Sequence, residues 1–165
     1  MIDGDDNRSA TAWSNRGRLP FPVVDVRQTA RAAREYEHLV IDTQARPSRN
    51  DLAALAAGCD ALILPTTPDA LALDALALTV AELRALKADR WRILLCTVPP
   101  PPSRDGEEAH EYLRSQNLPV LKNHVRRLAA FGKAALAGCL VQDVRDPRAP
   151  LGWADYAAVG KELMR

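Results

Sequence analysis

Two short groups of carboxylates have the composition of a site that handles phosphate and a divalent cation. They are the run Asp3-Gly4-Asp5-Asp6-Asn7 and the pair Asp42-Thr43. Carboxylates at a strand end that faces a phosphate group can hold Mg²⁺, directly or through its waters, and can orient an attacking water. Taken singly, each group is equally typical of a solvated turn, because Asp is an ordinary turn residue.

Several apolar runs predict the strands that would position these carboxylates. Leu39, Val40 and Ile41 form a continuous run just before Asp42, which is typical of a strand buried on both faces. Runs with the same pattern lie at 60–65 and 92–98, weaker ones at 118–121 and 138–141, and a short one at 23–26. Four prolines at 99–102 predict a stiff surface loop after the third run.

Helix-starting and helix-ending residues separate these runs. Ser48 is a predicted N-cap, and Gly58 is the predicted end of the same helix. The remaining helices are predicted over 69–88, 103–116, 124–137 and 153–164. Alternating strands and helices predict an α/β fold with a mostly parallel sheet and helices on both faces. Ligands in such folds bind beyond the carboxyl ends of the strands, where Asp42 and segment 97–102 lie.

Length and composition predict one domain spanning 1–165. With 22 basic against 21 acidic residues, the formal net charge is +1, so contact with nucleic acid requires a local patch. Three widely spaced cysteines predict no disulfide framework and fit a reducing, cytoplasmic location. The apolar stretches are far shorter than the about 20 residues that span a bilayer, so we expect no membrane partner.

The order of five sequence blocks resembles the ParA/MinD-type (deviant Walker A) partition ATPases over nearly the whole chain. The blocks are IDGDDNRSATAW, EHLVIDTQARPS, CDALILPTTPDALAL, ILLCTVPPPPSRDGEEAHEYL and GCLVQD. They are similar to an aspartate-x-aspartate strand end, the Walker B strand, a proline-ended strand with its helix, and the adenine-side strand and loop. The resemblance implies a P-loop NTPase-like fold with ATP and Mg²⁺ as cofactors.

The resemblance also implies roles for individual residues. Asp5 matches the aspartate that orients the hydrolytic water, and Asp42 matches the Walker B carboxylate that engages Mg²⁺ through water. The implied cofactor-binding residues are Asp3, Thr43, Thr97 and Pro99. The family often has Asn near Thr97 to read adenine, and this sequence departs from that pattern.

The family's phosphate-binding loop, KGGxGKT, has no counterpart, since the chain contains no GxxxxGK[ST] pattern. By resemblance, the first strand, that loop, its helix and most of the second strand are absent, which is about 30 or more residues, roughly one βαβ-sized unit. The backbone N–H groups and lysine of such a loop supply most of the attraction for a triphosphate. We therefore expect ATP binding by this chain to be weak or absent.

Two functions stay open. The first is a ParA-like ATPase of plasmid or chromosome partitioning whose true start lies upstream of Met1, working with a ParB-like partner protein, as a homodimer, on nonspecific DNA. The second is a non-catalytic ParA-like remnant that serves as a binding or dimerisation module, or a gene fragment without function. The resemblance implies a cytoplasmic or nucleoid-associated location.

A basic cluster in the last third of the chain is the candidate for DNA contact. Its members are Lys122, Arg126, Arg127 and Lys133. A solvated helix face accounts for the same cluster, given the neutral total charge.

Overall fold

The computed structural model describes residues 1–45 and 47–164. The chain forms two compact units, Met1–Pro47 with Ala129–Ala149 and Ser48–Leu128 with Pro150–Arg165, and each is described by itself. The single domain expected from length and composition stays a prediction. Within the described ranges, no helix is long and apolar enough to cross a membrane.

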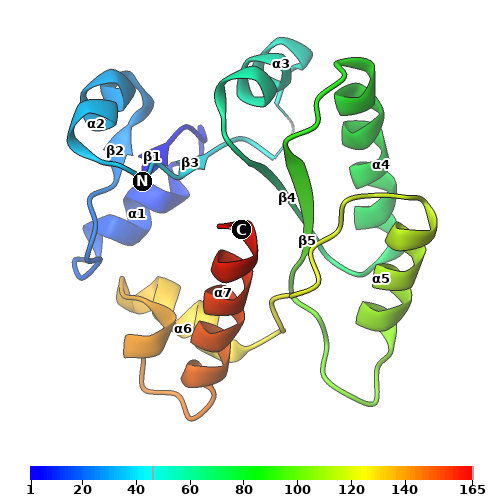
Figure 1. The fold of residues 1–165 in the computed structure, drawn as a ribbon. Coiled ribbons are helices and arrows are strands. Elements are labelled where there is room, and N and C mark those ends of the chain that lie inside the picture. The colour runs from blue at the N-terminus through cyan, green and yellow to red at the C-terminus, as the bar shows by residue number, and fades with distance from the viewer. Residues whose placement is uncertain (46, 165) are drawn as a thin grey trace. The chain divides into compact units, whose positions relative to one another are not determined.

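The first unit contains a parallel sheet with strand order β2-β1-β3. Its strands are β1 (Ile2–Asp3), β2 (Val24–Asp25) and β3 (Ile41–Asp42). Its helices are α1 (Ser9–Asn15), the 3-10 turn η1 (Val26–Gln28), α2 (Thr29–Glu35), α6 (Ala129–Ala137) and the 3-10 turn η2 (Val141–Asp143) (Figure 1). Ile2 pairs with Val24 on one side and Ile41 on the other, and it is fully buried. The central strand therefore fixes the register of both neighbours.

The second unit contains the parallel pair β4 (Leu62–Thr66) and β5 (Trp91–Leu95), in register from Leu62 opposite Trp91 onwards. Its helices are α3 (Arg49–Gly58), α4 (Ala70–Ala85), α5 (Asp105–Ser115) and α7 (Ala149–Leu163), whose first residue is grouped with the first unit. Parallel strands joined by helical crossovers confirm the predicted α/β class.

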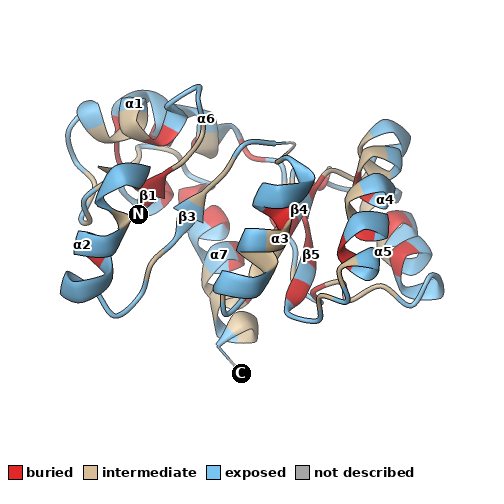
Figure 2. Ribbon diagram, turned by 90° about the horizontal axis from the view of Figure 1, so that it is seen from above, coloured by how far each residue is buried: buried red, intermediate tan, exposed pale blue. Residues whose placement is uncertain are grey.

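The core of the second unit lies between β5 and the helices that follow the two strands. Ile93 and Leu95 point into it from β5, Leu83 from α4 and Leu113 from α5, and all four are almost completely buried. Figure 2 shows these buried stretches facing one another while the outer helix faces are exposed. Strand and helices thus bury one continuous apolar surface, the main source of stability in such a layer.

Two of the predicted helix starts are confirmed by their caps. Ser48 Oγ accepts a hydrogen bond of 3.2 Å from Asp51 N at the start of α3. Asp69 Oδ1 accepts one of 3.0 Å from Ala72 N at the start of α4. Each cap satisfies a backbone N–H that lacks a partner within the helix.

The predicted strand at 39–41 is in part wrong. A strand exists at Ile41–Asp42, but Val40 is 65% exposed and Ile41 is 36% exposed, so it is not buried on both faces. The reason is its position, because β3 is an edge of the β2-β1-β3 sheet. An apolar run identifies a strand without saying where in the sheet that strand lies.

Three predictions in the last third of the chain also need correction. The helix predicted from 124 begins only at Ala129, because Val125 N and Arg127 N donate to Leu95 O and Val98 O, at 2.9 and 2.8 Å. The strand predicted at 138–141 is absent, since Gly138 has a left-handed φ of +65° and Val141 begins a 3-10 turn. The last helix begins at Ala149 instead of residue 153.

Gly138 is a position in the first unit where both the backbone conformation and the surrounding atoms require glycine. With φ at +65°, a Cβ there would lie 2.3 Å from Arg16 Cβ and 2.7 Å from the Arg16 carbonyl carbon. We expect Gly138→Ala to lower the free energy of unfolding by about 2 kcal/mol, because the strain of a positive φ adds to the clash of the new Cβ with the Arg16 backbone. Urea unfolding followed by circular dichroism measures this change.

Gly132, inside α6, is the matched control, because a Cβ there meets nothing within 4 Å. Gly132→Ala should be neutral or stabilise by up to about 1 kcal/mol through helix propensity. Equal destabilisation by both substitutions would contradict the tight packing of Gly138 against Arg16.

Candidate functional site

The register of the first sheet brings three aspartates to one edge. Asp3 ends β1 and lies opposite Asp25, which ends β2, and opposite Asp42, which ends β3. All three follow apolar residues at the carboxyl ends of parallel strands, the edge at which α/β proteins bind ligands. The structure therefore brings the predicted residues Asp3 and Asp42 together and adds Asp25 to them.

The loops that follow β1 and β3 are joined directly. Gly4 N donates to Asp42 O at 2.9 Å, and a Cβ on Gly4 would lie 2.9 Å from the same oxygen. Glycine is therefore required for this close approach. Gln44 Nε2 donates to Asp6 Oδ2 at 2.7 Å, so a second hydrogen bond connects the two loops.

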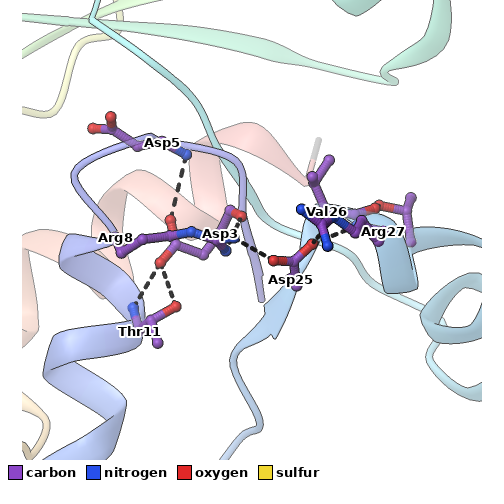
Figure 3. A network of polar contacts seen from close by, with 8 residues as sticks. Asp3, Asp5, Arg8, Thr11, Asp25, Val26 and Arg27 are labelled. Carbon is purple, nitrogen blue, oxygen red and sulfur yellow. Dashed lines mark hydrogen bonds and ion pairs between the residues drawn. The ribbon is translucent and has the colours of Figure 1, made fainter.

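Asp3 is a buried carboxylate, only 1% exposed, that organises the turn after β1 (Figure 3). Its Oδ2 accepts from Thr11 N at 2.8 Å and from Thr11 Oγ1 at 2.5 Å, and its Oδ1 accepts from Asp5 N at 3.4 Å. Burial alone would raise the pKa of Asp3, but these hydrogen bonds and the Arg8 charge hold the pKa below its ordinary value. Asp3 is thus ionised and positions the loop that carries Asp5.

Arg8 and Asp25 form an ion pair beside Asp3 that the sequence did not identify (Figure 3). Arg8 has a left-handed φ of 52°, and its Nη1 donates to Asp3 O at 3.4 Å. A hydrogen bond from Arg27 N and the pairing with Arg8 hold the pKa of Asp25 below its ordinary value. The available signal was that Asp25 follows the apolar residues Val23 and Val24, just as Asp42 follows the run 39–41.

The surroundings of Asp42 shift its pKa upward, opposite to the shifts of Asp3 and Asp25. Partial burial raises its pKa, and the negative charges of Asp3 and Asp5 raise it further. Asp5 itself is half-buried and accepts from Asn7 N at 3.1 Å. A divalent cation beside Asp42 would relieve this repulsion.

This donor set fits a Mg²⁺ ion that is held through its waters. Carboxylate oxygens are the ligands that Mg²⁺ prefers, and the ion usually keeps several waters when few protein ligands reach it. Among residues 1–45 and 47–164, no three or more His, Cys, Asp or Glu side chains are grouped closely enough to enclose a metal directly. Water-mediated contact is the mode that the sequence predicts for Asp42, with Thr43 next to it.

The adenine-side candidates lie in the second unit, directly after β5. Thr97 is exposed and has a left-handed φ of 55°. Pro99 is half-buried and lines a cavity of about 330 Å³, whereas Thr97 does not line it. Polar lining of this cavity comes from Ser103, Glu107, His110, Lys122 and His124.

Two of the four DNA-contact candidates are engaged in ion pairs. Arg126 donates to Asp155 from Nε at 2.8 Å and from Nη2 at 2.7 Å, and Asp155 is only 7% exposed. In the other unit, Lys133 Nζ donates to Asp146 Oδ2 at 2.6 Å. Lys122 and Arg127 are exposed and have no ion pair with a described carboxylate. DNA contact through this cluster stays a prediction.

Parallel strands connected by helices make this an α/β protein, and three aspartates at the carboxyl ends of β1, β2 and β3 are consistent with a P-loop NTPase-like fold. No family model matches the sequence. The chain is 31% identical over 172 residues to the maintenance of carboxysome distribution protein A of Gloeobacter kilaueensis, an alignment that covers 100% of this chain and 80% of that protein. The chain therefore belongs to the ParA/MinD-type family, as the order of its sequence blocks indicated.

Asp3 and Asp42 should affect stability with opposite signs. The folded-state pKa of Asp3 is lowered, so its contribution is present above the unfolded pKa of about 4 and is lost as pH falls through the folded value. Asp3→Asn should therefore cost about 1–3 kcal/mol at pH 7, the loss of hydrogen bonds to a buried charge. The cost should shrink below about pH 4, as measured by urea unfolding across pH.

The folded-state pKa of Asp42 is raised, so its ionisation disfavours the native state once pH exceeds the unfolded value. Asp42→Asn should raise the unfolding midpoint at pH 7, and the gain should vanish as pH falls below about 4. Asp74→Asn on the exposed face of α4 is the control and should change little at either pH. Destabilisation by Asp42→Asn at pH 7 would contradict the repulsion described for this edge.

Proposed function

We propose that this chain is a ParA-type positioning protein that uses Mg²⁺–ATP to distribute a large intracellular assembly. The observation that carries the proposal is Asp42 at the carboxyl end of β3, where Asp3 and Asp5 oppose its ionisation. Perturbed carboxylates of this kind are typical of functional sites. Identity of 31% across the full chain to a protein named for carboxysome distribution supports the same reading.

Each residue of the edge has a distinct role in this proposal. When bound, Mg²⁺–ATP would supply the γ-phosphoryl group and the charge that activates it for attack by water. Asp42, with Thr43 beside it, would hold the metal ion through a water. Asp5 would accept a proton or a hydrogen bond from the attacking water, and Asp3 holds the Asp5 loop in place.

For the second unit taken by itself, we propose that the residues after β5 contact a nucleobase. Pro99 contributes an apolar wall of the 330 Å³ cavity, and Thr97 lies in the turn before it. His110, which lines this cavity, contacts Leu121 O through Nε2 at 3.1 Å, which keeps α5 close to Leu121. Flat apolar walls and a few polar groups suit a nucleobase.

For the cargo, the name of the relative favours a protein microcompartment over a plasmid or a chromosome. A ParB-like adaptor, a homodimer and nonspecific DNA complete the family-type cycle as proposals. The second candidate function is a non-catalytic binding or dimerisation module. It is favoured by one sequence feature, the lack of any GxxxxGK[ST] pattern in the 165 residues.

Titration of the purified chain separates these possibilities. We expect Mg²⁺–ATP to bind more weakly than micromolar, because no lysine-bearing loop neutralises the triphosphate. We also expect Mg²⁺ alone to raise the thermal midpoint of the wild type, and Asp42→Ala to abolish that rise while Asp74→Ala retains it. Calorimetry and thermal unfolding measure the two effects.

Micromolar binding of ATP would support the proposal and would contradict only the expectation that binding is weak without such a loop. One result would count against the proposal. A Mg²⁺ response that persists in both Asp5→Ala and Asp42→Ala would remove these carboxylates from the site. In the native host, Asp42→Ala should cause evenly spaced compartments to cluster, if the protein distributes them. Plasmid loss with unchanged spacing of the compartments would instead favour a role in plasmid partitioning.

A further inference from the structure

Segment 121–127 of the second unit lies beside β5 like an irregular further strand. Leu121 N donates to Ile93 O and Val125 N donates to Leu95 O, each at 2.9 Å. Isolated parallel bridges at 120 and 126 continue this pairing at its two ends. Strand β5 therefore holds one side of the segment through backbone hydrogen bonds.

Helix α7 holds the other side of the same segment through two carboxylates. Glu162 Oε1 accepts from Lys122 N at 2.8 Å, and its Oε2 accepts from Asn123 N at 3.1 Å and from Asn123 Nδ2 at 2.8 Å. Asp155 Oδ2 accepts from Arg126 N at 3.1 Å, in addition to its bonds with the Arg126 side chain. For these three backbone N–H groups, the two carboxylates take the place of a neighbouring strand.

The position and charge of the two carboxylates suit this contact. Asp155 and Glu162 are seven residues apart, which places them on one face of α7. Burial alone would raise the pKa of Glu162, but the hydrogen bonds from Lys122 N and from Asn123 hold the pKa below its ordinary value. Glu162 is therefore ionised at neutral pH, and hydrogen bonds to a charged acceptor are stronger than those to a neutral one.

The segment that α7 holds is also a wall of the cavity of about 330 Å³. Lys122 and His124 line this cavity, and Leu121 O contacts the ring of His110, which lines it too. Lys122 and His124 are exposed, so burial does little to fix their side chains. Their positions therefore depend on the backbone of the segment, which β5 and α7 hold between them.

We propose that Glu162 and Asp155 are positioning residues that fix this cavity wall, so that docking of α7 and binding of a nucleoside in the cavity stabilise each other. Neither carboxylate is among the residues that line the cavity, so both act through the segment. Coupling between two sites is reciprocal, so a ligand that favours the held segment also favours the docked helix. The inference rests on the proposed function for the class of ligand.

Adenosine is the probe that tests this coupling, because it carries a base and no phosphate and so does not need a phosphate-binding loop. Chemical-shift titration by NMR measures its binding, and amide hydrogen exchange of the same samples reports on the segment. The test variant is Glu162→Gln, which turns one acceptor oxygen into an N–H₂ donor. The matched control, Glu111→Gln, makes the same chemical change at an exposed position of α5.

We expect Glu162→Gln to weaken adenosine binding about fivefold or more and to speed exchange of the amides at 122 and 123, while the amides of β4 and β5 keep their protection. Adenosine should slow exchange of the same two amides in the wild type, which a purely structural role of Glu162 would not produce. Asn123→Ala removes only the Nδ2 bond, so it should act in the same direction and less strongly. Glu111→Gln should match the wild type.

Unchanged adenosine affinity in Glu162→Gln, or amides at 122 and 123 that do not respond to adenosine, would overturn the inference and leave the proposed function intact. Should Glu162→Gln unfold, Asn123→Ala decides the question by the same two measurements. Failure of the wild type to bind adenosine would overturn both the inference and the assignment of a nucleobase to the cavity. Adenosine binding that depends on Glu162, without binding of Mg²⁺–ATP, would support the inference and count against the proposed function.

Discussion

The carboxyl edge of the first unit depends on one buried, ionised carboxylate. Asp3 joins the end of β1 to α1 through Thr11 and to the following loop through Asp5 N, so a single side chain fixes the path of the chain around the candidate site. A charged side chain is stable inside a protein only when hydrogen bonds replace those that it makes with water. Once Asp3 is ionised, its charge acts on Asp42, whose strand lies in register beside β1.

Asp42 therefore lies where a carboxylate is electrostatically unfavourable, and under the proposed function a cation would relieve this repulsion. Sites of this kind lower stability in exchange for binding or chemistry. Gly4 contributes by allowing the two strand ends to approach to hydrogen-bond distance, and Gln44 closes the neighbouring loops through Asp6. In the second unit, the acidic residues at the helix starts have structural roles, since Asp69 caps α4 and Glu107 in the first turn of α5 pairs with Arg104.

Features set by neighbouring residues could be predicted from the sequence, and features set by distant pairing could not. The helix caps Ser48 and Asp69 could be predicted from the sequence, because each cap bonds to a residue only three positions later. The exposure of Val40 could not be predicted, because it depends on where β3 lies in the sheet. Helices α1 and α2 have only seven residues each and little apolar periodicity, and pairing of Val125 with Leu95 replaced the predicted start of a helix. In the candidate site, Asp3 and Asp42 could be predicted because each lies at the end of a predicted strand. The ion pairs Arg8–Asp25 and Arg126–Asp155 could not be predicted, because their partners are far apart in sequence.

The strand-end carboxylates are electrostatically coupled, because the charge of ionised Asp3 opposes ionisation of Asp42. Carbon-detected NMR titration of the side-chain carboxyl groups measures this coupling directly. We predict that Asp3 titrates below the ordinary aspartate value and Asp42 above it, and that Asp3→Asn moves the Asp42 transition downward. Ordinary titration of both groups, or no response of Asp42 to the loss of Asp3, would contradict it.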